Sequence, residues 1–175
     1  EVVTLELAAD TGRALATVLG GRGRVAVGYD TRTSSQLLEN ALIAGLLECG
    51  CDVIRLGMVP TPLVGYATSR LGADAGVMIT ASHNPAPYNG IKLWNPDGMA
   101  YRPSQEREIE SVIHEGSFLK REWDGLGSIR EMDITSRYMD EVLSMVKMER
   151  ELKVVIDCGC GAASHISPLI FRRSG

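Results

Sequence analysis

The sequence predicts an α/β protein in which helices cover both faces of a mostly parallel, mixed sheet, giving three α/β/α layers. Three observations support this fold class. Short runs rich in β-branched residues alternate with longer segments of helically spaced apolar residues, and glycine or proline stands at most of the boundaries. In addition, 45% of the 175 residues are hydrophobic, so the chain can bury a core without disulfides or structural metals.

The first half of the chain is expected to alternate between helices and strands. The predicted elements are a helix up to about Leu19, a strand at Arg24–Tyr29, a helix at Leu37–Leu47, a strand at Asp52–Leu56, a helix from Thr61 to about Leu71 and a strand at Ala75–Thr80. Glycines follow two of the helices closely, where a C-cap is expected. This alternation is typical of a parallel sheet covered by helices.

The second half is less regular. We expect a strand at Ile91–Trp94, a turn at 95–98, a surface helix at Gln105–Ile113, a loop or weak strand at 116–131, and a helix at Asp133–Met148 with Ile134, Tyr138, Val142, Leu143 and Val146 inward. Leu152–Ile156 is predicted to be a new strand. The domain boundary is therefore expected after this helix: residues 1–148 form a first, N-terminally incomplete domain, and 149–175 begin a second, truncated one.

Charge and hydropathy argue against several classes of protein. The net charge of −4 and the pI near 5.4 do not suit a basic nucleic-acid-binding module, and prolines interrupt the longest apolar stretches before they could span a membrane. No leader sequence is visible at Glu1, although a leader that had been removed would leave no trace; the expectation of a cytoplasmic protein comes from the cysteines. The cysteines form two C-x-C pairs, Cys49/Cys51 and Cys158/Cys160, which we interpret as small, mostly buried thiols in a reducing compartment rather than a zinc site.

Function is expected at the loops that follow Tyr29, Thr80 and Ile156, because open α/β sheets bind ligands at the carboxyl ends of their strands. The middle loop is the most informative, with the sequence Thr-Ala-Ser-His-Asn-Pro at 80–85. A hydrolase pair of Ser82 and His83 is disfavoured, since adjacent side chains on a loop point in different directions. Ser82 and Asn84 could instead only stabilise the turn before Pro85, and spacing alone does not decide between structure and function.

The residues around this loop resemble a known family. Residues 80–85, followed by Tyr-Asn-Gly-Ile-Lys at 88–92, are similar to the phosphoserine loop of the α-D-phosphohexomutases, the phosphoglucomutase/phosphomannomutase family. The segments 28–35, 57–62, 75–76 and 97–98 also follow that family's order and approximate spacing. The resemblance covers about residues 4–115, and 152–175 resemble the opening of the family's second domain.

The resemblance implies an isomerase that acts as an intramolecular phosphotransferase. The parent protein would interconvert hexose 1-phosphate and hexose 6-phosphate, with Ser82 carrying the phosphoryl group and Mg²⁺ as the cofactor held through that phosphate. Lys92, His83 and Arg32 are the further catalytic candidates: Lys92 as general acid or base, and Arg32 as an anchor for phosphate or for neighbouring groups. Asn84 and Asn89 are candidate substrate-binding residues.

The implied partners are a phosphorylated hexose, the hexose bisphosphate intermediate and the remaining domains of the parent chain, and a homodimer is compatible with the resemblance. The family's glycine-rich opening segment, its metal-binding loop and its loops for sugar and far phosphate do not occur in these 175 residues. We therefore expect this piece alone to be inactive. The amino-acid sequence of the loop favours mannose or glucose phosphate over glucosamine phosphate as the substrate.

Two alternatives remain open from the sequence. The chain could be a non-catalytic binding or structural domain that retains the fold and the loop. It could also be a fragment of a nucleotide-dependent oxidoreductase, because Gly159-x-Gly161-x-x-Ser164 after a predicted strand partly matches a dinucleotide fingerprint.

Overall fold

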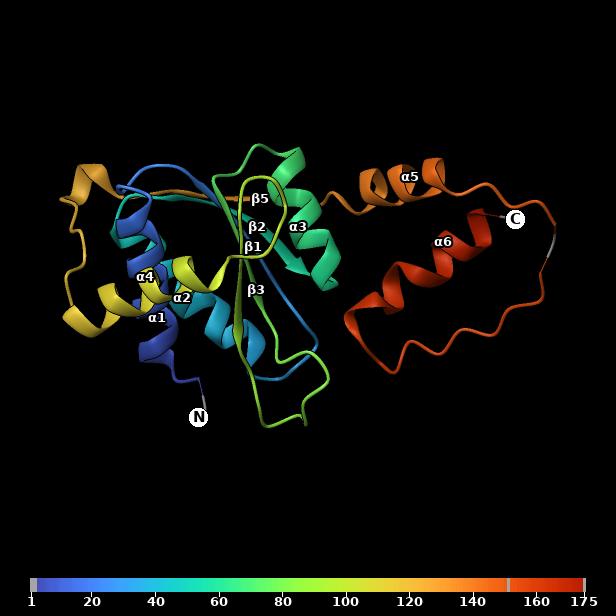
Figure 1. The fold of residues 1–175 in the computed structure, drawn as a ribbon, viewed down its shortest axis with the longest axis horizontal. Helices are drawn as coiled ribbons and strands as arrows, with labels where there is room; N and C mark the ends of the chain where they lie inside the picture. The colour runs from blue at the N-terminus through green and yellow to red at the C-terminus, as the bar shows by residue number, and fades with distance from the viewer. Residues whose placement is uncertain (1–2, 151, 175) are drawn as a thin grey trace.

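The computed structural model describes residues 3–150 and 152–174 and contains a five-stranded sheet with the strand order β4-β3-β1-β2-β5 (Figure 1). The strands are β1 (Arg24–Tyr29), β2 (Asp52–Met58), β3 (Ala75–Ile79), β4 (Ile91–Trp94) and β5 (Ile129–Glu131). The α-helices are α1 (Leu5–Val18), α2 (Ser35–Glu48), α3 (Thr61–Arg70), α4 (Pro103–Glu115), α5 (Thr135–Met145) and α6 (Ser167–Arg173), with short 3₁₀ turns η1 (Trp123–Gly125) and η2 (Ala162–His165).

The sheet is mixed and mostly parallel, as the sequence predicts. β1 pairs in parallel with β2 and β3, β2 pairs in parallel with β5, and only the pairing of β3 with β4 is antiparallel. All five residues of β3 are buried, because this strand has a neighbour on each side and helices over both faces. The carboxyl ends of β1, β2 and β3 therefore meet at one edge of the sheet.

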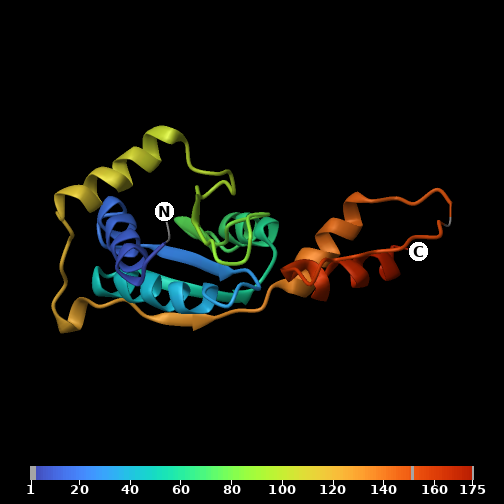
Figure 2. The same cartoon turned by 90° about the horizontal axis from the view of Figure 1, so that it is seen from below.

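Helices cover both faces, which confirms the three-layer prediction (Figure 2). Side chains of α1, α2 and α4 pack with Val25 and Val27 in one apolar cluster, whereas α3 and α5 pack with Ala26 in the other. α1 and α2 cross closely at two glycines: an added Cβ would lie 2.2 Å from the Leu42 oxygen at Gly12 and 2.1 Å from the Ala9 oxygen at Gly45. These glycines allow the two backbones to pack in direct contact.

The C-terminal part departs from two expectations. Leu152–Ile156 is extended but is not a strand, since it pairs with no other described segment, and Val155 is 99% exposed. The helix expected over Asp133–Met148 is shorter, and Val146, expected to point inward, is 50% exposed. α5 and α6 pack on each other beside α3, where Arg173 bonds Asp140 at 2.5 Å. Figures 1 and 2 show this pair extending from one end of the sheet.

Surface properties agree with part of the sequence interpretation. Cys49 and Cys51 are buried as expected, whereas Cys160 is exposed. Burial raises the pKa of the Cys51 thiol to about 11. Within the described residues, no helix combines the length and apolar character that crossing a membrane requires.

Candidate active site

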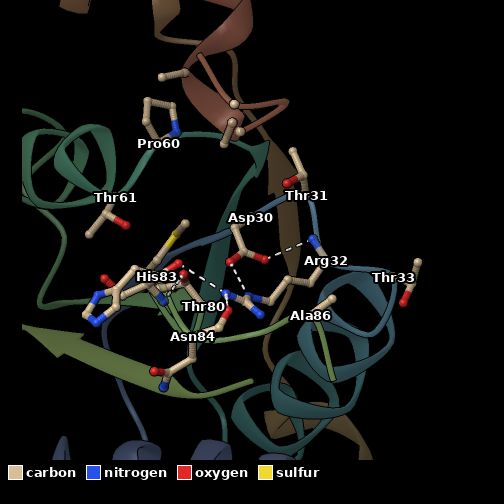
Figure 3. Close-up of a pocket in the computed structure, with 16 residues that line it drawn as sticks. Asp30, Thr31, Arg32, Thr33, Pro60, Thr61, Thr80, His83, Asn84 and Ala86 are labelled. Atoms are coloured by element: carbon tan, nitrogen blue, oxygen red, sulfur yellow. Dashed lines mark hydrogen bonds and ion pairs between the residues drawn. The ribbon is translucent and has the colours of Figure 1, made fainter. Parts of the chain in front are cut away.

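A cavity of about 680 Å³ opens at the carboxyl edge of the sheet (Figure 3). The three loops singled out in the sequence meet around it, and the start of α3 adds a fourth wall. Its lining residues are Asp30–Thr33 after β1, Pro60 and Thr61 at α3, Met78, Thr80, Ser82, His83, Asn84 and Ala86 at and after β3, and Gly159, Gly161, Ala162 and Ala163. The position of this cavity is the one that an open α/β sheet uses for ligands.

Ser82 lies exposed on the cavity wall in a strained backbone conformation. Its φ is +56°, in the left-handed region that non-glycine residues rarely adopt. The Ser82 N–H donates to Oγ1 of Thr80 at 2.9 Å, and the Asn84 N–H closes a turn by donating to the Ala81 carbonyl at 3.0 Å. Such strain costs on the order of 1–3 kcal/mol and persists where the surroundings enforce it, often at functional sites.

Arg32 holds this loop from the neighbouring strand. Its Nη1 donates to the carbonyl oxygens of Pro85 (2.8 Å) and Tyr88 (3.0 Å), its Nη2 to those of Ser82 (3.1 Å) and Asn84 (2.7 Å), and its Nε to Oδ2 of Asp30 (3.1 Å). A guanidinium has five N–H donors, so all five bond the protein itself. Of the two anchoring roles expected for Arg32, the structure supports the holding of neighbouring groups over direct contact with phosphate.

Asp30, which the sequence analysis did not single out, pairs with Arg32 at the end of β1. Burial opposes its ionisation, but hydrogen bonds from Ser35, Thr80 and Arg32 outweigh this effect and lower the pKa of Asp30 below its ordinary value. The side chains of Arg32 and Asp30 are only 10% and 15% exposed. Asp30 and Arg32 therefore form a nearly enclosed ion pair whose two charges cancel.

Two predicted site residues lie outside the lining of the cavity. The Asn89 amide donates to the hydroxyls of Ser34 (3.0 Å) and Ser35 (2.9 Å), and its carbonyl accepts the Gly90 N–H. These contacts show that Asn89 ties the loop to the start of α2. Lys92, exposed on β4, is in register with Met78, which lines the cavity. Side chains directly opposite on paired strands share one face of the sheet, so Lys92 begins on the cavity side.

The structure brings four predicted residues together: Ser82, His83, Asn84 and Arg32 all contribute to the cavity wall. Figure 3 shows the His83 and Asn84 side chains on the loop that Arg32 holds. Sequence reasoning missed the wall at Thr61, although a helix that begins directly after a parallel strand places its N-terminus at this edge.

The described residues do not form a divalent-cation site on their own. They contain no group of three or more His, Cys, Asp or Glu side chains placed to hold a metal. Asp30, the acid on the cavity wall, already accepts hydrogen bonds on both carboxylate oxygens. What this chain offers near the cavity is the Ser82 hydroxyl, to which the sequence analysis assigns a phosphoryl group; the oxygens of such a group would suit a hard cation.

Comparison with known proteins identifies the family. Residues 1–120 match the family described as phosphoglucomutase/phosphomannomutase, alpha/beta/alpha domain I. The chain belongs to this family. Curated relatives named "Probable phosphoglucosamine mutase" include those of Methanothermobacter thermautotrophicus, 74% identical over 175 residues, and Methanobrevibacter smithii, 57% identical over 174 residues. These matches cover 100% and 99% of this chain but 39% of each relative.

A solved phosphoglucomutase/phosphomannomutase family protein from Burkholderia thailandensis has the same fold, with a TM-score of 0.86 and 32% identity over 99% of this chain and 39% of its own. Membership of the phosphoglucomutase/phosphomannomutase family excludes the oxidoreductase alternative. The structure agrees, because the strand expected before Gly159 is not formed and a 3₁₀ turn, Ala162–His165, follows Gly161.

Proposed function

We propose that the parent protein of this chain is a phosphoglucosamine mutase, which moves a phosphoryl group between the C6 and C1 oxygens of glucosamine phosphate. The observation that carries the proposal is the Ser82 hydroxyl, which is exposed on the wall of the cavity in a strained turn that four hydrogen bonds from Arg32 stabilise. The choice of sugar rests on the names of the relatives. It reverses the preference for mannose or glucose phosphate that the loop sequence suggested.

The electrostatics of the cavity suit a phosphorylated serine. Phosphorylation of Ser82 would add a charge of about −1.5 to −2. α3 begins at Thr61, which also lines the cavity, and the positive end of its helix dipole favours an anion there. Arg32 neutralises the negative charge of Asp30, so the Asp30 carboxylate should not repel a phosphate on Ser82.

The proposed step is an in-line transfer. A sugar hydroxyl attacks the phosphorus on Ser82 Oγ, the bond between phosphorus and the serine oxygen breaks, and a new bond to the sugar oxygen forms. The proton of the attacking hydroxyl passes to a base, and Ser82 recovers a phosphoryl group from the other position of the sugar bisphosphate. We assign the proton transfer to Lys92, which starts on the cavity side of β4 and whose amine can exchange a proton.

Other parts of the parent protein complete this site. This chain spans 39% of the length of its relatives, and its described residues supply no cluster of metal ligands. We propose that Mg²⁺ is held by the phosphate on Ser82 together with residues from the rest of the parent, and that the enzyme is cytoplasmic. The 175-residue chain alone should have negligible turnover, because positioning supplies most of the catalysis of phosphoryl transfer.

The test uses the full-length parent. Its intact mass is expected to show one phosphoryl group, mapped to Ser82, and ³¹P NMR is expected to show conversion of glucosamine 6-phosphate to glucosamine 1-phosphate. Ser82→Ala should abolish this conversion with an unchanged melting temperature, since an exposed hydroxyl contributes little to packing.

Ser111→Ala is the matched control. Ser111 is also an exposed serine, but it lies on α4 and donates only to Glu115, so activity should be unchanged. Near-normal conversion by Ser82→Ala in the presence of added sugar bisphosphate would refute the phosphoserine role. Turnover of mannose or glucose phosphate, but not of glucosamine phosphate, would refute the proposed sugar.

A further inference from the structure

The Asp30 carboxylate has no part in the transfer chemistry, yet both of its oxygens are bonded. Oδ1 accepts from the Arg32 N–H at 3.1 Å and from the Ser35 hydroxyl at 2.6 Å, while Oδ2 accepts from Arg32 Nε at 3.1 Å. Figure 3 shows the Asp30 carboxylate directed at Arg32, with Thr80 on the other side of the guanidinium. A carboxylate that accepts on both oxygens fixes the direction of the guanidinium it faces.

One path leads from Asp30 through Arg32 to the carbonyl oxygen of Ser82. The guanidinium is a rigid plane, so the bond from Nε to Asp30 also sets the direction of Nη1 and Nη2. Those two nitrogens bond four carbonyl oxygens between residues 82 and 88, including that of Ser82 at 3.1 Å.

Thr80 holds the other side of Ser82, because its Oγ1 accepts the Ser82 N–H at 2.9 Å. The Thr80 side chain is buried and lies close to Asp30, where it helps to lower the pKa of that carboxyl. The carbonyl of Ser82 is therefore linked through Arg32 to Asp30, and its amide is fixed by the neighbouring Thr80.

We propose that Asp30 is a positioning residue for phosphoryl transfer, holding Ser82 in its left-handed conformation through Arg32, whose guanidinium bonds both Asp30 and the Ser82 carbonyl. This inference rests on the proposed mutase function. Asp30 contacts neither the sugar nor the transferred group in this scheme. It keeps the Ser82 oxygen at the position from which attack in line is possible.

Asp30→Asn in the full-length parent is the decisive variant. Asparagine has almost the same shape but supplies one acceptor oxygen and an NH₂ group. Because both oxygens of Asp30 accept hydrogen bonds, the variant must place a donor against an N–H or hydroxyl donor on one side. We expect kcat to fall on the order of 10–10²-fold, the scale of a misplaced reacting group, with a much smaller change in KM. The ³¹P resonance of phosphorylated Ser82 should shift or broaden.

Asp133→Asn is the matched control. Asp133 also accepts the backbone N–H two residues later, that of Thr135 at 2.8 Å, and its pKa is lowered mainly by hydrogen bonds from Thr135. It precedes α5 and does not line the cavity. The kcat and the ³¹P spectrum of the Asp133→Asn parent should match those of the wild type.

Two further measurements keep the proposal falsifiable. Arg32→Lys keeps the positive charge but removes the planar fork that joins Asp30 to the Ser82 carbonyl. It should lower kcat in the same direction, which tests the proposal if Asp30→Asn does not fold. Amide hydrogen exchange over residues 82–88 is independent of turnover and should accelerate in Asp30→Asn.

The two proposals fail in different ways. A wild-type parent without phosphorylated Ser82 and without turnover would refute the mutase function, while the exchange data would still decide whether Asp30 holds the loop. Wild-type kcat, ³¹P resonance and exchange rates in folded Asp30→Asn, or wild-type kcat in Arg32→Lys if the first variant does not fold, would overturn the role of Asp30.

Discussion

The buried ion pair between α2 and β2 provides a sharp stability prediction. Glu39 is fully buried, and its Oε2 accepts hydrogen bonds from Arg55 Nε at 3.0 Å and Nη2 at 2.5 Å. Its Oε1 has no hydrogen-bond partner among the residues that the structure describes. Burial raises the pKa of Glu39, although Arg55 partly opposes this. The carboxylate therefore depends on a single cation.

Arg55→Met removes that cation and keeps most of the apolar stem. Removal of one partner from a buried pair typically costs 3–5 kcal/mol. Since the Arg55 side chain is 23% exposed, water can reach part of the site, and we expect the lower end of this range, about 3 kcal/mol at pH 7. That is a change of ~10²-fold in the unfolding equilibrium. Glu39→Met/Arg55→Met should recover most of the loss, because it removes both charges.

The loss should also depend on pH. Without Arg55, the folded-state pKa of Glu39 rises further above the value in the unfolded chain. The free energy of unfolding of the variant is then highest at low pH, where Glu39 is protonated and uncharged, and it falls as the pH rises through the folded-state pKa. The loss of stability caused by Arg55→Met should therefore become smaller when the pH is lowered from 7 to about 5.

Urea denaturation followed by circular dichroism at both pH values measures this effect. Arg173→Met, which breaks the exposed pair with Asp140, is the control and should cost less than ~1 kcal/mol. A loss below about 1 kcal/mol for Arg55→Met at pH 7, or an equal loss at both pH values, would show that Glu39 does not depend on Arg55 as argued.

Three further predictions concern catalysis, packing and thiol reactivity. Lys92→Met in the parent should lower kcat on the order of 10²–10⁴-fold, and Lys92→Arg should not restore it because guanidinium does not release its proton near neutral pH; full activity of Lys92→Arg in steady-state kinetics would contradict the acid–base role. Gly45→Ala would place a Cβ 2.1 Å from the Ala9 oxygen, so the melting temperature should fall with a loss of about 1–3 kcal/mol, and an unchanged value would mean that α1 and α2 separate freely. Maleimide at neutral pH should label Cys160, which is exposed, and spare Cys51, which is buried with its pKa raised to about 11; equal labelling in peptide mapping of the native protein would disprove this contrast.

Much of the fold could be predicted because local signals and long-range pairing agree. The strands at Arg24–Tyr29 and Ile91–Trp94 have the predicted bounds, since apolar runs flanked by turn residues leave few choices. Leu152–Ile156 carries the same kind of signal but forms no strand. A strand requires a partner for its backbone groups, and no described segment supplies one there.

The candidate site was predictable at the level of loops rather than contacts. Its position follows from topology, which brings the carboxyl ends of the parallel strands together. The partners of Arg32 do not follow, because they are carbonyl oxygens that every residue possesses. Asn89 shows the same limit: the two serines that it bonds lie more than 50 positions earlier in the chain, at separations of 55 and 54 residues.

The use of main-chain oxygens by Arg32 has a consequence for how this loop can diversify. The four carbonyl groups belong to residues 82, 84, 85 and 88, and a carbonyl remains an acceptor whatever side chain its residue carries. A substitution at 84, which lines the cavity, can therefore alter the chemistry that faces it while the path of the chain is retained. A loop built in this way can explore new ligands without losing its shape.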